Sequence, residues 1–132
     1  MKIRNIAILV FMTTALLLAG CRAAPIRNID DMPTNIPANR SANDVKKAII
    51  LAGRQLGWVF KETKPDLLEG RLHLRDHVAV VDIPYTRKSY SIHYKSSLNL
   101  NYDPTDNSIH KNYNSWVRNL NNAIQVQLGA LD

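Results

Sequence analysis

The sequence predicts a small α+β domain, in which an N-terminal and a C-terminal helix pack on one face of a four-stranded antiparallel meander in the order α-β-β-β-β-α. Apolar residues recur with the period of a helix in two segments, and with the period of a strand in the segment between them. The connections between the strands are short, which favours antiparallel neighbours. The chain has 132 residues and one cysteine, so we expect a single domain without an internal disulfide.

The first helix is expected over residues 42–56. Ser41 and Asp44 have the spacing of a capping box, in which the side chain of each residue accepts a hydrogen bond from the backbone N–H of the other. Gly57 is placed to end the helix. One apolar stripe lies at helical spacing in between: Val45, Ala48, Ile49, Ala52 and Leu56.

Four strands are expected next. They cover residues 57–63, 67–74 and 77–85, followed by an alternating segment from Tyr90 to Lys95. The polar segment 96–108 is too long for a hairpin turn, and its spaced apolar residues leave a short extra edge strand open.

The second helix is predicted from an apolar stripe that begins at Tyr113 and ends at Leu128, with Gly129 at the stop position. The apolar faces of both helices and of the sheet together give the expected core: Val45, Ile49, Leu56, Trp58, Leu72, Val81, Ile83, Ile92, Tyr94, Trp116, Leu120 and Ile124.

The N-terminal residues predict export. Lys2 and Arg4 precede thirteen residues, Ile6 to Leu18, of which only two threonines are not strongly apolar. This is the pattern of a signal-peptide core, and it is shorter than the roughly 20 apolar residues that a membrane-spanning helix needs.

The sequence Leu18-Ala19-Gly20-Cys21 resembles a bacterial lipobox. The resemblance implies cleavage after Gly20, a diacylglycerol on the Cys21 thiol and a fatty acyl chain such as palmitate on the new amino terminus. Because residue 22 is Arg rather than Asp, similarity to Gram-negative lipoproteins implies sorting to the outer membrane, most simply facing the periplasm. A free thiol after an ordinary secretory signal is the alternative.

The chain therefore divides into a lipoprotein signal peptide (1–20), an acylated cysteine with an extended linker (21–40) and the α+β domain (41–132). Three prolines and the lack of an apolar period favour a tether that holds the domain off the membrane. Three isoleucines leave open a second arrangement, in which part of this arm lies along the domain as an edge strand: Ile26, Ile29 and Ile36.

Four motifs are similar to those of a group of small lipoproteins of Gram-negative bacteria that have no assigned activity. These motifs cover residues 72–75, 90–94, 99–102 and 109–117. The resemblance implies an envelope location and a single domain, and it supplies no catalytic residues.

Strand alternation places six residues on the uncovered face of the sheet: Arg71, His73, Val78, Val80, His93 and Lys95. Apolar residues flanked by cations on an open face suit an anionic or amphipathic partner, such as an envelope protein or an anionic envelope polymer. The alternative is an ordinary half-polar outer face.

No catalytic motif is found in the sequence, which lacks a glycine-rich phosphate loop, a Gly-x-Ser-x-Gly elbow and a His-Glu-x-x-His helix. We therefore expect no enzymatic activity and no cofactor. His73 and His93 lie on strands separated by another strand, roughly 9 to 10 Å apart, so we expect no shared metal.

The chain carries 17 basic and 11 acidic residues, and removal of the signal peptide leaves 15 basic residues. A periplasmic address makes nucleic acid an unsuitable partner for this charge. We expect a membrane-anchored interaction module of the envelope, bound to the lipid bilayer through acylated Cys21. The alternative is a small-ligand or metal-binding sensor that uses the histidine-bearing face.

Overall fold

The computed structural model describes residues 22–132. The predicted signal peptide and Cys21 lie outside these residues. The described residues form two helices and seven strands, in the following order: β1 (Ala23–Pro25), β2 (Ile29–Pro33), α2 (Ala42–Gln55), β3 (Trp58–Lys64), β4 (Leu67–Leu74), β5 (His77–Pro84), β6 (Ser89–Leu98), β7 (Ser108–His110) and α3 (Asn112–Gly129).

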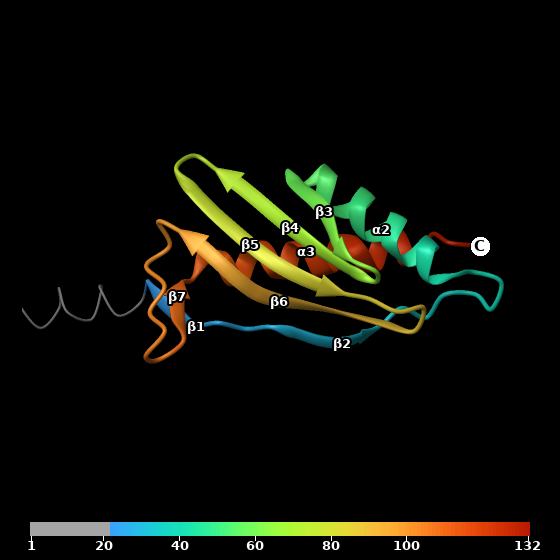
Figure 1. Cartoon of the computed structure of the whole chain (residues 1–132), viewed down its shortest axis with the longest axis horizontal. Coiled ribbons are helices and arrows are strands. Elements are labelled where there is room, and N and C mark those ends of the chain that lie inside the picture. Colours follow the sequence, from blue (N-terminus) through green and yellow to red (C-terminus); the bar gives the residue numbers. More distant parts are fainter. Residues whose placement is uncertain (1–21) are drawn as a thin grey trace, which may run out of the picture.

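The predicted α+β fold is confirmed. Strands β3 to β6 form the expected antiparallel meander, and β2 extends it to five strands in the order β2-β6-β5-β4-β3. Figure 1 looks onto the open face of this sheet, with α3 behind it. The two helices pack against each other as well as on the sheet, so one core lies between the helices and the inner face.

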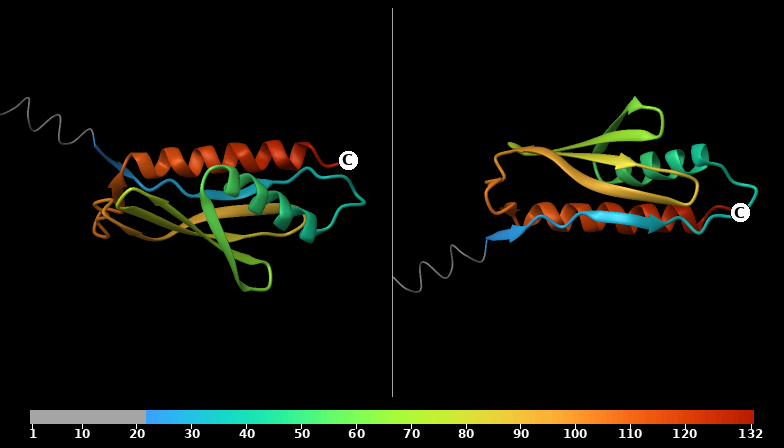
Figure 2. Two further views of the ribbon diagram at one scale, coloured as in Figure 1. Left: turned by 90° about the horizontal axis from the view of Figure 1, so that it is seen from above. Right: turned by 60° about the horizontal axis from the view of Figure 1, so that its bottom comes forward.

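The N-terminal arm is part of the domain. β1 pairs with β7, and β2 pairs with β6, where Ile29 lies opposite Ile92. The prediction of an extended tether over 21–40 is therefore wrong from residue 22 onward. The structure contains the alternative arrangement, in which part of this arm is an edge strand. The physical reason is burial of its isoleucines, which pack at the margin of the core. Figure 2 shows the arm running beside α3 for most of the length of the helix.

The end of the arm is clamped by one arginine. The Arg87 guanidinium donates to the carbonyl oxygens of Arg40 and Pro37, at 2.8 Å each. Nearby, the Thr34 backbone N–H donates to the Lys88 carbonyl at 2.9 Å. These bonds hold the segment that leads into α2, where the predicted capping box between Ser41 and Asp44 is present.

The core contains the predicted apolar residues with one exception. Leu56 is 42% exposed, because α2 ends at Gln55 and Gly57, with φ of 92°, turns the chain directly into β3. Tyr94 and Trp116 are half-buried at the edge of the core. Several fully buried side chains were not among the predicted core residues: Leu68, Leu100, Ile109 and Tyr113.

A phenylalanine ring occupies a slot between two glycines. Phe60 on β3 lies opposite Gly70 on β4, where an added Cβ would come within 3.0 Å of the ring. On the other side, an added Cβ at Gly53 of α2 would overlap the same ring. The two glycines thus allow α2 to approach β3 closely.

We expect Gly53→Ala to destabilise the domain by about 1 to 3 kcal/mol, because the Phe60 ring must leave its slot. The matched control is Gly129→Ala at the end of α3, where nothing lies within 4 Å of the new methyl group. Alanine favours the helix there, so the control should be neutral or more stable. Urea unfolding of both variants measures the difference, and equal stabilities would contradict the slot.

Candidate functional site

The six residues predicted for the open face lie there. Residues on this face are paired across β4, β5 and β6: Arg71 with Val80, His73 with Val78, and Asp82 with His93. A β-bulge follows Val80, and it leaves Lys95 between Tyr94, which faces the core, and Ser96, which lies opposite Val80. The Lys95 ammonium nevertheless reaches the open face.

The cations of this face are paired with carboxylates. Lys95 Nζ donates to Glu69 Oε2 at 2.7 Å and lies 3.6 Å from Asp82 Oδ1. Arg71 is 4.0 Å from the other Glu69 oxygen. The hydrogen bond from Lys95 lowers the pKa of Glu69 and, reciprocally, raises the pKa of Lys95. The face therefore presents an alternating charge pattern instead of a cationic rim.

The two predicted apolar residues at the centre of the face are covered by their neighbours. Val78 is 6% exposed and Val80 is 3% exposed. The accessible apolar surface on this face instead comes from Val59 on β3 and Leu98 at the end of β6, which lie opposite Arg71 and Val78. Alternation around Trp58 and Phe60 is consistent with Val59 on this face, whereas the expected strand ended at Lys95, and Leu98 reaches this face because of the bulge in β6.

The histidines of the open face do not converge. His73 on β4 lies opposite Val78 of β5, and His93 on β6 lies opposite Asp82 of β5. The spacings along and between strands therefore put the two histidines roughly 16 Å apart. His93 Nε2 lies 2.7 Å from Oδ1 of Asp30, a residue of β2. Within residues 22–132, no three side chains of His, Cys, Asp or Glu are grouped to hold a metal ion.

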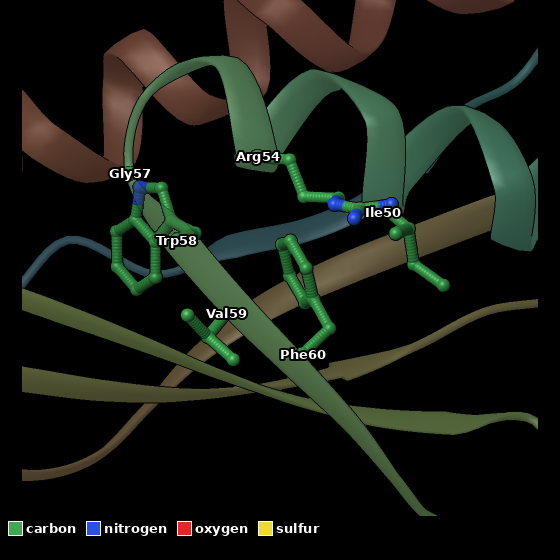
Figure 3. A pocket seen from close by; sticks show the side chains of 6 residues that line it. All are labelled: Ile50, Arg54, Gly57, Trp58, Val59 and Phe60. Carbon is green, nitrogen blue, oxygen red and sulfur yellow. The ribbon is translucent and has the colours of Figure 1, made fainter.

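A hollow of about 520 Å³ lies between α2 and the edge strand β3 (Figure 3). The helix and strand run in opposite directions from the turn at Gly57, so Arg54 and Ile50 lie across the space from Phe60. Val59 lines the hollow as well, although its place opposite Arg71 puts it on the open face of the sheet. Beyond these residues, Lys46 Nζ and Glu62 Oε2 form an ion pair at 2.5 Å that joins helix to strand. Trp58 also lines the hollow.

Arg54 is the one charged residue that lines this hollow, and the other lining residues are apolar apart from Gly57. In the described part of the chain, no carboxylate forms an ion pair with Arg54. The site was missed in the sequence because Ile50 falls outside the apolar stripe of α2. The sequence signal was Ile50, an apolar residue that lies outside the stripe and one helical turn before Arg54. Two aromatic residues, Trp58 and Phe60, follow in the next strand.

Tyr113 places a hydroxyl group inside the core. Among residues 22–132 the Tyr113 hydroxyl has no hydrogen-bond partner, and burial raises the pKa of Tyr113. The ring centroids of Tyr94 and Tyr113 lie 5.5 Å apart in an edge-on arrangement. Because Tyr113 is fully buried, its hydroxyl has no route to a substrate.

Comparisons of this chain with models of protein families, with curated protein sequences and with solved structures find no match. The similarity to Gram-negative lipoproteins therefore stays a prediction from the motifs. Among residues 22–132, no helix is long and apolar enough to cross a membrane.

We expect the pairing of Glu69 with Lys95 to make stability depend on pH. Because the pKa of Glu69 is lowered in the folded state, its contribution is present above the unfolded value near 4.5 and is lost as pH falls through the folded value. Glu69→Gln should lower the melting temperature at pH 7, and the gap to the wild type should close at lower pH and at high salt.

The control for this prediction is Lys95→Met. Removing either partner should abolish the same pH dependence, and the double variant should cost less than the sum of the two single changes. If the costs add, the pair does not interact in solution.

Proposed function

We propose that this protein is a lipid-anchored, non-enzymatic interaction module of the bacterial envelope, held at the outer membrane and facing the periplasm. The observation that carries the proposal is Leu18-Ala19-Gly20-Cys21 at the end of an apolar stretch. Each buried methylene contributes about 0.8 kcal/mol, so two or three acyl chains would hold the domain to the bilayer essentially permanently.

The open face of the sheet is the proposed docking surface, and its partner is a protein. A polyanion would have to displace Glu69 from both Arg71 and Lys95, at the cost of leaving a carboxylate unpaired. A protein surface with charges of both signs can instead match the alternating pattern. The exposed Val59, opposite Arg71, supplies an apolar contact on this face.

Lipidation is tested by mass spectrometry of the protein purified from a Gram-negative host. We expect a mature chain that begins at Cys21 and carries the mass of a diacylglycerol and an acyl chain. The variant Cys21→Ser should lose the lipid and leave the membrane fraction. The variant Arg22→Asp should keep the lipid and move to the inner membrane. A free thiol or an intact leader on the wild-type protein would overturn the proposal.

The hollow between α2 and β3 favours a second function, binding of a small amphipathic anion. Its volume lies within the range of roughly 300 to 1,000 Å³ that is usual for small-molecule sites. Apolar walls with a single cation suit a ligand that has an apolar body and one acidic group. This function retains the small-ligand alternative but moves it away from the histidines.

The second function is tested with anilinonaphthalene sulfonate and with phenylnaphthylamine, which has the same rings without the sulfonate. We expect the anionic probe to bind about five- to tenfold more tightly, because its sulfonate pairs with Arg54. Arg54→Gln should abolish this preference, whereas Arg118→Gln on the exposed surface of α3 should leave it unchanged. Equal binding of both probes by the wild type would exclude an anion site.

A further inference from the structure

We propose that the end of the domain where the chain enters lies directly against the bilayer, with Leu74, Leu98 and Tyr102 at the depth of the lipid headgroups. This inference rests on the proposed lipidation of Cys21. It concerns the orientation of the domain, which lipidation alone leaves undetermined.

The chain is fixed to the domain at the first residue after Cys21. The Arg22 carbonyl accepts a hydrogen bond from the Lys111 backbone N–H at 2.9 Å. Two further bonds join the entry segment to α3: the Asn114 amide donates to the Pro25 carbonyl at 2.8 Å, and its oxygen accepts from the Arg27 N–H at 3.0 Å. β1 pairs with β7 between these points.

This attachment removes the slack that a linker would provide. Consecutive Cα atoms are about 3.8 Å apart, so one peptide bond separates the acylated residue from the folded domain. A flexible tether of about 20 residues would instead have a root-mean-square length of roughly 25 Å and would let the domain turn freely. The surface around Arg22 must therefore lie next to the lipid.

Several segments share this end of the molecule. Figure 1 and both views of Figure 2 place β1, β7, the β4–β5 turn, the end of β6 and the loop that follows it on the side where the chain enters. This end carries three of the seven large apolar side chains that are exposed in the described residues: Leu74 (45% exposed), Leu98 (57%) and Tyr102 (39%).

The loop that carries Tyr102 has a defined shape. Asn99, Asn101 and Asn107 have positive φ, a conformation that asparagine adopts more readily than most residues. The Asn99 side chain donates to the Asp76 carbonyl at 2.7 Å, which joins this loop to the β4–β5 turn. The Tyr102 ring lies 4.6 Å from the ring of Tyr94. The exposed apolar groups are therefore held in place before any contact with lipid.

The charges at this end balance. Three cations and three carboxylates lie on the segments that share it: Arg22, Arg75, Lys111, Asp76, Asp103 and Asp106. Contact with the bilayer thus depends on the anchor and on the apolar and tyrosine side chains, which favour the membrane interface. We expect the orientation to be insensitive to salt and to the fraction of anionic lipid.

The orientation is tested by labelling an introduced cysteine with an environment-sensitive fluorophore in the lipidated protein, reconstituted in phosphatidylethanolamine–phosphatidylglycerol vesicles. Cys21 is the one native cysteine and its thiol would be blocked by lipid, so the new cysteine alone reacts. Labels at Leu98→Cys and Tyr102→Cys should be quenched by spin-labelled lipids. The matched control is Lys88→Cys, an exposed position in the β5–β6 turn at the opposite end, and it should not be quenched.

A spacer of about twelve Gly and Ser residues between Cys21 and Arg22 provides a second control. It has a root-mean-square length of roughly 20 Å, and it should remove the difference between the two ends.

The outcomes separate the two proposals. If mass spectrometry finds no lipid on Cys21, the proposed anchoring fails. If lipid is present but the labels at 98 and 102 are no more quenched than the label at 88, the anchoring stands and the orientation is wrong. If Tyr102→Cys disturbs the loop by removing the contact between Tyr102 and Tyr94, the label at Leu98→Cys decides the test.

Discussion

The structure depends on the binding of residues 22–40 along the domain. This arm supplies the fifth strand through β2, closes the small sheet through β1, and leads into the capped start of α2. Its prolines do not prevent this, because proline is tolerated on edge strands, where its missing N–H leaves no central ladder bond unmade. One segment therefore stabilises the margin of the core and fixes the point at which a lipid anchor would be attached.

Much of the fold follows from local patterns in the sequence. The capping box and the apolar stripe define α2, and alternation defines β3 to β6, because these signals arise from neighbouring residues. The fifth strand is different: Ile29 lies opposite Ile92, and no local period shows a pairing between such distant segments. Leu56 was misplaced because the turn at Gly57 ends the helix one residue before the stripe does.

The candidate site shows the same boundary between local and non-local information. Alternation placed Arg71 and Lys95 on the correct face, although Lys95 reaches it through a bulge. Their shared partner, Glu69, belongs to the same face by the same alternation, but its distance to Lys95 depends on the register of β4, β5 and β6. The hollow depends on how α2 packs against β3, where Gly53 and Gly70 leave room for the Phe60 ring, and only the folded structure reveals this packing.

The two proposals are geometrically compatible. The chain enters at one end of the long axis of the molecule (Figure 1), whereas the open face of the sheet runs along its side. With the entry end at the bilayer, the long axis is directed away from the membrane, and the open face is presented sideways to the periplasm. The hollow between α2 and β3 lies at the edge of the sheet opposite β2, away from the arm. A short attachment can therefore orient the domain so that only the entry end of the open face, at Leu98, meets the bilayer, while the rest of that face and the hollow stay accessible.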